Sequence, residues 1–244
     1  MLYDLPAPAK LNLFLHVVGR RVDGYHLLES LFRLISLSDA VTIDLRTDGV
    51  ISREPCSAMT WSQADDLAIR AAKALQQATG TRTGAHIAIR KRIPAGGGLG
   101  GGSSDAATVL LGLNRLWRTG LTRQQLMALG LPLGADVPFF LFGQSAFVTG
   151  IGEQFQPVSI PHHSYVVTQP NASVPTPKIF GAADLTRDSE PVKISDFSGL
   201  NRALVRFTGS YAFGRNDLEP VVKRLFPVVS TTQQWLATQG VLSR

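Results

Sequence analysis

The sequence is poor in cysteine, since Cys56 is the only one among 244 residues. An internal disulfide is therefore impossible, and zinc sites that need two or four thiolates are excluded. A reducing cytosol fits this composition. The start of the chain carries Asp4 and Lys10 before a short apolar run, whereas a secretory signal has its basic residues first. We therefore expect a cytoplasmic protein.

Long apolar runs are missing as well. No window approaches the ~20 consecutive apolar residues that a membrane-spanning helix requires, so we expect no membrane association. With 44% hydrophobic and 17% charged residues, the chain can bury a full core as one large or two smaller domains. The net charge of +6 attracts nucleotides, phosphorylated metabolites and nucleic acid alike, and does not choose among them.

Hydrophobic spacing and turn residues predict a mixture of strands and helices. Strands are predicted at residues 11–18, 40–45, 86–93 and 165–168, and helices at 65–78, 104–117, 122–129 and 216–226. Asp65 or Asp66 would cap the first helix and Thr122 the third, while Asn216 and Glu219 would form a near capping box that opens the last. A thinning of the apolar pattern predicts two domains, residues 1–152 and 153–244.

A glycine-rich segment, IPAGGGLGGGSSDAA, joins the strand predicted at 86–93 to the helix predicted at 104–117. Its six glycines leave little to pack, but they let backbone N–H groups surround a polyphosphate. The following helix adds the free amides and positive dipole end of its N-terminus. The predicted nucleotide-binding residues of this segment are Pro94, Ala95, Gly96, Gly97, Gly98, Leu99, Gly100, Gly101, Gly102, Ser103 and Ser104.

The two serines of this segment are candidates to donate their hydroxyls to phosphate oxygens or to water on a bound magnesium ion. Asp105 either orients that metal or simply favours the helix N-terminus. The basic alternation of residues 89–93, IRKRI, predicts a strand with a wet basic face, from which Lys91 or Arg92 could reach the nucleotide.

Other loop types fit this segment less well. A P-loop needs a lysine after its glycines, and none follows here. Gly96, Gly98 and Gly101 satisfy GxGxxG, but a dinucleotide site needs an acidic residue about twenty positions further on, and residues 115–121 contain none. The segment could also be a flexible linker, but such linkers seldom lie between a strand and a helix that are both clearly predicted, so this interpretation is weak.

Three segments together resemble the GHMP small-molecule kinases over nearly the whole chain. They are PAPAKLNLFLHVVGRRVDGYHLLESLF near the start, the glycine-rich segment, and LGADVPFFLFG at 133–143; VPTPKIF at 174–180 and NDLEP at 216–220 give weaker support. The resemblance implies an α+β fold of two domains, a ribosomal protein S5 domain 2-like N-terminal domain and a ferredoxin-like C-terminal domain. The latter is expected to be C-terminally incomplete, because the family's third glycine motif would begin where GVLSR ends the chain. We expect a form without that motif to be impaired or inactive.

The resemblance also implies an activity. ATP, as its Mg²⁺ complex, would give its γ-phosphoryl group to the 2-hydroxyl of a cytidine-diphosphate-linked sugar alcohol in non-mevalonate isoprenoid biosynthesis. Asp136 matches the family's proposed base, and Lys10 matches the lysine beside it; a neighbouring lysine favours an ionised carboxylate and an emerging alkoxide. By themselves, Asp136 could cap a helix and Lys10 could be a surface lysine. No set of protein metal ligands is predicted.

The resemblance further implies residues that bind the cytidyl substrate. Tyr25 and Phe180 would stack on the cytosine ring, and His26 or nearby backbone would form hydrogen bonds with it. The remaining substrate-binding candidates are Asn12, Thr176 and Pro177. Asp66 stands where relatives often have an asparagine that faces adenine. Singly, an aromatic at 180 is more often a core residue, His26 a surface histidine and Asn12 a buried strand amide.

Three alternatives remain open. A GHMP kinase for another alcohol, such as mevalonate or homoserine, shares the glycine-rich segment, and a non-catalytic nucleotide-binding remnant would bind ATP without turnover. Nucleic-acid binding ranks third, because the basic residues lack interleaved aromatics. We expect ATP and the sugar alcohol as partners, no nucleic acid and no membrane, and a monomer or weak homodimer.

Overall fold

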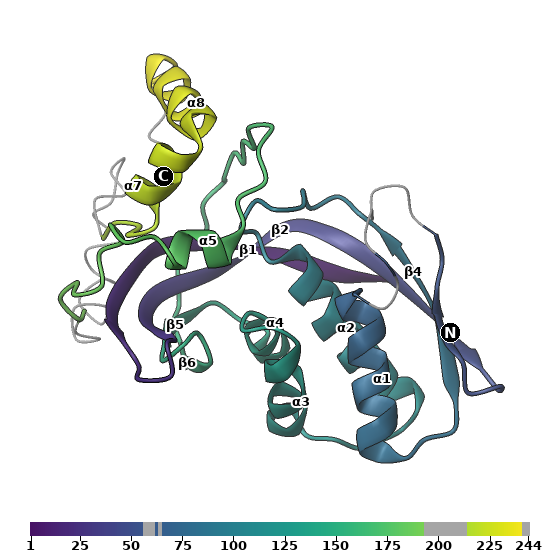
Figure 1. The fold of residues 1–244 in the computed structure, drawn as a ribbon. Helices are drawn as coiled ribbons and strands as arrows, with labels where there is room; N and C mark the ends of the chain where they lie inside the picture. Colours follow the sequence, from purple (N-terminus) through teal and green to yellow (C-terminus); the bar gives the residue numbers. More distant parts are fainter. Residues whose placement is uncertain (56–61, 63–64, 193–213, 241–244) are drawn as a thin grey trace. The chain divides into compact units, whose positions relative to one another are not determined.

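The computed structural model describes residues 1–55, 62, 65–192 and 214–240, so Cys56 lies outside the described residues (Figure 1). The chain forms two compact units. Unit 1 comprises Met1–Lys10, Leu34–Ala95 and Leu99–Gln144, and unit 2 comprises Leu11–Arg33, Gly96–Gly98 and Ser145–Arg244. Two long strands, β1 (Leu2–Arg20) and β2 (His26–Arg46), pair with each other and contribute residues to both units. A domain boundary near residue 152 stays a prediction.

In unit 1, β2 pairs with β4, and β4 pairs in turn with β3. β4 (Gly84–Arg90) is antiparallel to β2, with Val41 opposite Ile89, and β3 (Ile51–Arg53) is parallel to β4. Alternation along β2 and β4 buries one set of side chains, as expected for strands that face a core on one side. The buried strand residues include Val41, Ile43, Ile87 and Ile89.

The described residues of unit 1 form four helices. They are α1 (Leu67–Thr79), α2 (Gly101–Leu116), α3 (Arg123–Gly130) and α4 (Val137–Phe142), with a 3₁₀ turn at Leu131–Leu133. α2 contacts the other three helices (Figure 1). The predicted caps are confirmed: the Asp66 side chain accepts a hydrogen bond from the Ala68 amide, and Thr122 forms a capping box with Gln125.

Helix α2 begins earlier than the sequence suggested. The prediction started it at Ser104, whereas the structure starts it at Gly101, after Gly100 in a left-handed conformation with φ 73°. A left-handed glycine turns the chain sharply, so helical geometry resumes at the very next residue. Part of the glycine-rich segment is therefore helix rather than loop.

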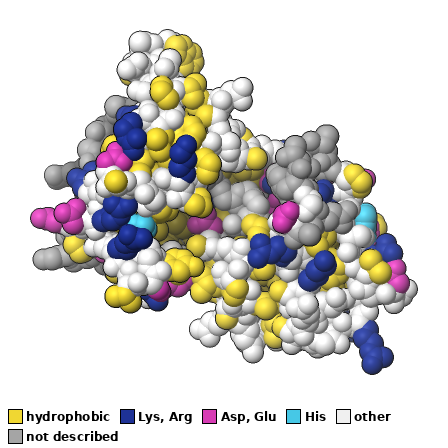
Figure 2. Space-filling view, viewed as in Figure 1, with side chains coloured by type: hydrophobic (Ala, Val, Ile, Leu, Met, Phe, Trp, Pro, Cys, Tyr) yellow, Lys and Arg dark blue, Asp and Glu magenta, His cyan; other side chains and the backbone are white. Residues whose placement is uncertain are grey.

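In unit 2, β2 continues into a short antiparallel sheet. β5 (Ala146–Thr149) pairs with β2, and β6 (Gln154–Pro157) pairs with β5. Among the residues described after β6, the helices are α5 (Thr176–Phe180), α7 (Glu219–Leu225) and α8 (Pro227–Thr238). A hydrophobic core in unit 2 joins β1 to α5 and α7 and contains Leu15, Val17, Ile179, Leu185 and Val221. Two large side chains of α8, Val228 and Trp235, stay 41% and 57% exposed, and hydrophobic surface is visible over this helix in Figure 2.

Two sequence predictions in unit 2 were wrong. Residues 165–168 form neither strand nor helix, and Val166 is 86% exposed. Apolar β-branched residues form a strand only where another strand pairs with them. The sequence of this segment does not show whether such a partner strand lies beside it. Helix α7 begins at Glu219 rather than Asn216, because the Asn216 side chain accepts a hydrogen bond from the Leu218 amide and forms a turn before the helix.

The segment NDLEP connects α7 to strand β1 through Asp217. This residue is 3% exposed and its carboxylate accepts hydrogen bonds from the Val17 amide, the Ser189 hydroxyl and Nε of Arg215. Burial opposes its charge, but these donors outweigh it and lower the pKa of Asp217. The motif therefore stabilises the fold of unit 2. Among the described residues, the structure contains no helix both long and apolar enough to span a bilayer.

Candidate active site

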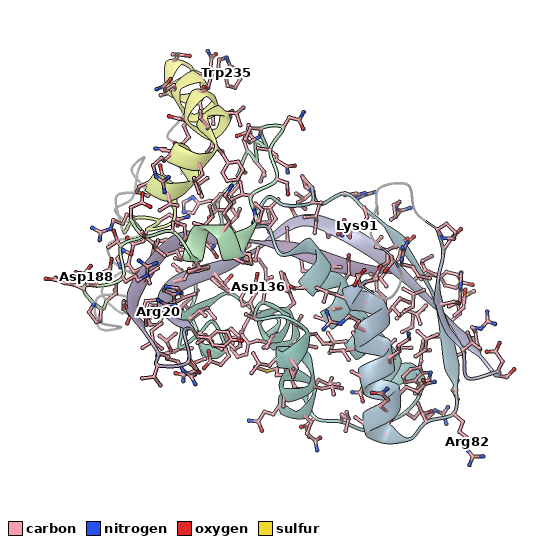
Figure 3. The ribbon with its side chains drawn as sticks, viewed as in Figure 1. Arg20, Arg82, Lys91, Asp136, Asp188 and Trp235 are labelled. Atoms are coloured by element: carbon pink, nitrogen blue, oxygen red, sulfur yellow. The ribbon has the colours of Figure 1, made fainter. Side chains whose placement is uncertain are left out.

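Lys10 and Asp136 lie together in unit 1. Lys10 is in β1 with its side chain 5% exposed, and Asp136 immediately precedes α4 with its side chain 34% exposed (Figure 3). Lys10 Nζ is 3.6 Å from Asp136 Oδ2, which is beyond a good hydrogen bond but close enough for a strong charge interaction. The arrangement places an enclosed cation beside a carboxylate that remains open to a ligand.

Asp136 does not use its side chain to cap α4. It occupies the N-cap position with helical backbone angles, φ −83° and ψ −15°, and within the described part of the chain its carboxylate accepts no capping hydrogen bond. An N-cap residue that caps normally has an extended backbone and a side-chain bond to the helix amides. The carboxylate is instead directed to Lys10.

The end of the glycine-rich segment runs directly beside this pair. The Lys10 amide donates to the Leu99 carbonyl at 3.0 Å. A Cβ on Gly100 would lie 2.7 Å from the Phe140 ring and 3.3 Å from Cγ of Lys10, and its φ of 73° is strained for any other residue type. The chain can approach the pair this closely only because residue 100 has no side chain.

The rest of the segment differs in exposure along its length. Ala95, Gly96, Gly97 and Gly98 are exposed and Leu99 is buried, while Pro94, Gly101 and Ser103 are half-buried and Gly102 is exposed. In unit 2, the Gly96 carbonyl accepts from the Val174 amide. In unit 1, Gly101, Gly102 and Ser103 form the first turn of α2, whose amides have no partner within a helix.

Of the two serines, only Ser103 is accessible. Ser104 is fully buried, and its amide already donates to the Gly100 carbonyl. Ser103 Oγ lies 3.6 Å from the position that a Cβ on Gly134 would occupy, close to the loop that leads into Asp136. The structure therefore favours Ser103 over Ser104 as a hydroxyl that meets a ligand.

Lys91 belongs to a buried cluster that the sequence did not reveal. Its ammonium donates to Asp105 at 2.7 Å and also to Asp39, and the three side chains are 9%, 3% and 0% exposed (Figure 3 labels Lys91). Asp39 also accepts from the Arg92 and Ile93 amides. The cluster thus fixes the residues just before and just after the glycine-rich segment. A single aspartate just before the strand predicted at 40–45, which the structure places within β2, gives no sequence signal for this role.

Burial and charge shift the pKa values in this cluster. Burial raises the pKa of Asp105 to about 7, because its loss of solvation exceeds the stabilisation by Lys91, and Asp39 adds a like charge. For Lys91, burial acts against the charged form, but the Asp105 and Asp39 carboxylates outweigh it and the pKa is raised. The charged form of Lys91 is therefore favoured, while Asp105 takes up a proton more readily than an exposed aspartate does.

The side chain of Asp66, the candidate adenine contact, also has partners within the protein. It is 3% exposed, caps α1, and lies 2.7 Å from Nε of Arg53, which is equally buried. A buried aspartate with a helix cap and an arginine is explained by stability alone. A contact with adenine stays a prediction.

Unit 2 gathers most of the predicted substrate residues around α5. The rings of His26 and Phe180 lie 5.0 Å apart at an interplanar angle of 30°. Thr176 and Pro177 are exposed at the start of the same helix that ends at Phe180, and Tyr25, next to His26, is 59% exposed. Exposed aromatic surface beside a half-buried pair of rings is suited to a flat heterocycle. Asn12 is half-buried in β1.

The sequence also missed Arg187. Its Nε donates to Nε2 of His26 at 3.0 Å. Burial, and then the charges of Arg187 and Arg20, lower the pKa of His26. No sequence signal could have identified this contact, because the two residues are 161 positions apart.

Comparison with protein families and characterised proteins gives consistent matches. Residues 66–144 match the GHMP kinases N terminal domain. A 4-diphosphocytidyl-2-C-methyl-D-erythritol kinase from Bordetella bronchiseptica is 58% identical over 243 residues, which cover 100% of this chain and 78% of that protein. A kinase of the same name from Herminiimonas arsenicoxydans is 54% identical, with 98% of this chain and 81% of that protein covered.

Solved structures agree with these sequence matches. A crystal structure of a 4-(cytidine 5'-diphospho)-2C-methyl-D-erythritol kinase has a TM-score of 0.79 and 36% identity, over 98% of this chain and 84% of that one. A crystal structure of L. major mevalonate kinase in complex with R-mevalonate has a TM-score of 0.51 at 15% identity, over 85% of this chain and 64% of that one, and shows likeness of fold alone. The predicted α+β fold of the GHMP kinase type is confirmed.

Proposed function

Because this chain belongs to the family of 4-diphosphocytidyl-2-C-methyl-D-erythritol kinases, we propose that it transfers the γ-phosphoryl group of ATP to the 2-hydroxyl of 4-diphosphocytidyl-2-C-methyl-D-erythritol, in non-mevalonate isoprenoid biosynthesis. The observation that carries the proposal is the Lys10–Asp136 pair beside Gly100 and the first turn of α2. A base, a cation and a row of backbone amides are the parts that phosphoryl transfer needs.

In the proposed reaction, Asp136 accepts the proton of the 2-hydroxyl as its oxygen attacks the γ-phosphorus. The new O–P bond forms while the bond from the γ-phosphorus to the β,γ-bridging oxygen breaks, and ADP leaves. Lys10, at 3.6 Å from the carboxylate, stabilises the negative charge that develops on the attacking oxygen. The partial exposure of Asp136 supports this role, because the alcohol must reach it.

The proposed phosphate site is the glycine-rich segment with the start of α2. Amides of Gly101, Gly102 and Ser103 lie at the positive end of a 16-residue helix, which favours anions. Magnesium would arrive with the nucleotide and neutralise phosphate charge. Of the residues proposed to face it, Ser103 offers an accessible hydroxyl, whereas the Asp105 carboxylate is paired with Lys91.

The proposed cytidyl site is in unit 2. Tyr25 and Phe180 offer ring faces to cytosine, His26 offers a hydrogen bond, and Thr176 and Pro177 line the pocket; Asn12 would bind the sugar alcohol. Base–aromatic stacking contributes about 1–3 kcal/mol per base in comparable sites. We further propose a cytoplasmic monomer or weak homodimer, which sedimentation would test.

The proposal is tested by a panel of acceptor alcohols. Purified protein is incubated with ATP, Mg²⁺ and either 4-diphosphocytidyl-2-C-methyl-D-erythritol, mevalonate or homoserine, and ADP and the phosphorylated product are quantified by mass spectrometry. We expect product from the cytidyl substrate alone. Phosphorylation of another alcohol would identify a different GHMP kinase activity, and ATP binding without any product would identify a non-catalytic nucleotide-binding protein.

A further inference from the structure

Arg187 is fixed in place by backbone carbonyls of the segment that follows α5. Its guanidinium donates to the carbonyls of Ala182 at 2.7 Å, Leu185 at 2.9 Å and Phe180 at 3.2 Å. These bonds hold the planar group so that its Nε–H is directed at Nε2 of His26, 3.0 Å away. The contact is therefore built by the local fold of the same segment that carries Phe180.

The contact determines where the His26 ring carries its proton. A guanidinium has five N–H donors and no acceptor, and it stays charged at all ordinary pH values. Nε2 of His26 must therefore present its lone pair, so the imidazole is neutral and its proton is on Nδ1. The lowered pKa of His26 agrees with a neutral ring. Nδ1 of His26 is thereby a hydrogen-bond donor.

A donor at this position distinguishes two pyrimidines. Cytosine has a lone pair on N3 and accepts a hydrogen bond there, whereas uracil carries a hydrogen on N3 and donates. An Nδ1–H group can pair with N3 of cytosine, but it meets another donor at N3 of uracil, and an unmatched buried polar contact costs about 1–3 kcal/mol. With the proton on Nε2 instead, Nδ1 would accept a hydrogen bond, and the preference would be reversed in favour of uracil.

We propose that Arg187 is a specificity-determining positioning residue, which selects cytosine over uracil by fixing His26 in its Nδ1–H form. The proposal rests on the proposed function, which places the base at His26 and Phe180. Arg187 itself need not touch the substrate. Its effect on base choice passes through the tautomer of His26, and this separates it from a residue that only supports the fold.

The variants are chosen to separate the tautomer from charge and from folding. Arg187→Met removes every donor, and Arg187→Lys keeps the positive charge but lacks the planar Nε–H group. Arg20→Met is the matched control, because Arg20 also acts on His26 through its charge but donates to the Gly24 carbonyl instead of the imidazole. Arg20 has no proposed role in binding or catalysis.

The first measurement is the nitrogen NMR spectrum of protein labelled with ¹⁵N-histidine, which distinguishes the two tautomers without any turnover. We expect the wild type and Arg20→Met to show His26 with its proton on Nδ1. In Arg187→Met and Arg187→Lys we expect a mixture in which the Nε2–H form is prominent. A wild-type His26 with its proton on Nε2 would overturn the proposal.

The second measurement is the affinity of the same proteins for CMP and for UMP by calorimetry. We expect the wild type and Arg20→Met to prefer CMP by about 5- to 140-fold, the ratio that 1–3 kcal/mol of discrimination gives. Both Arg187 variants should lose most of that preference. If the tautomer changes and the preference does not, the inference is wrong; if the wild type discriminates but phosphorylates no cytidyl substrate, the proposed function is wrong and the inference stands.

Discussion

Two sets of lysine–aspartate contacts in unit 1 join the same kinds of side chain but differ in distance and in exposure to solvent. Lys91 lies at 2.7 Å from Asp105 and also contacts Asp39, with all three side chains less than a tenth exposed. Lys10 lies 3.6 Å from Asp136, whose side chain is 34% exposed. In the first set the Lys91 ammonium donates to both carboxylates and all three side chains are buried, which suits a structural role. In the second, the carboxylate is near its cation but open on one side, which suits a group that must meet a substrate.

The largest expected effect comes from the open pair. Asp136→Asn removes the proposed base and should lower kcat by about 10²–10⁴-fold, the usual contribution of a general base. The ATP dissociation constant should change little, because phosphate contacts come from backbone amides. A coupled ADP assay and calorimetry with ATP measure the two quantities. Asp48→Asn, at an exposed surface carboxylate, is the control. Retained turnover would remove Asp136 from the base role.

A substitution in the buried cluster of Lys91, Asp105 and Asp39 should lower stability rather than turnover. Lys91→Met leaves two enclosed carboxylates without their cation and should lower the free energy of unfolding by about 3–5 kcal/mol, the range found when one partner of a buried pair is removed. Arg46→Met, which breaks the exposed contact to Asp48, should change it little. Urea denaturation of both variants provides the comparison. Similar losses in the two would contradict the structural role of the cluster.

Two glycines with the same backbone angle test the spacing beside the open pair. Gly98 and Gly100 have φ of 72° and 73°, but only Gly100 has neighbours within 4 Å of an added Cβ. Gly98→Ala should cost about 1–2 kcal/mol for the left-handed conformation. Gly100→Ala should cost about 1–3 kcal/mol more for its clash with Phe140. Urea denaturation measures the difference, and equal losses would show that residue 100 is not crowded.

The last expected effect is a dependence of stability on pH, with Asp105 as its source. Its pKa is about 7 in the folded protein and 3.8 when unfolded, so the folded state binds the additional proton between these values. The free energy of unfolding should therefore fall as pH rises from 3.8 through about 7, by at most about 1.4 kcal/mol per pH unit. Asp105→Asn should remove this contribution. Urea denaturation across that pH range measures it; an unchanged slope would show that Asp105 does not titrate there.

The sequence predicted local features better than distant ones. The caps at Asp66 and Thr122 depend on residues within three positions, and both were found. The helix after the glycine-rich segment was found, although α2 starts three residues earlier than predicted, and the segment's role as a ligand site stays a prediction. The strand expected at 165–168 failed because pairing depends on another part of the chain.

The candidate site divides in the same way. Lys10 and Asp136 could be paired beforehand only through a family resemblance, because nothing local connects positions so far apart. Asp39 and Arg187 had no such help: their partners, Lys91 and His26, are 52 and 161 residues away. Contacts of this kind form between segments that are distant in sequence. A single aspartate or arginine is not part of a repeating pattern, so the sequence alone does not predict its partner.

The missing side chain at Gly100 also limits how this protein can vary in nature. Every other amino acid would place a carbon against Phe140 and Lys10, so we expect any amino-acid substitution there to be destabilising. Gly98 has the same backbone angle and open space around an added Cβ, so packing within the fold constrains it less, and the main restriction on residue 98 would come from the proposed phosphate site. Among naturally occurring variants, we expect residue 100 to stay glycine whether or not the chain binds a nucleotide.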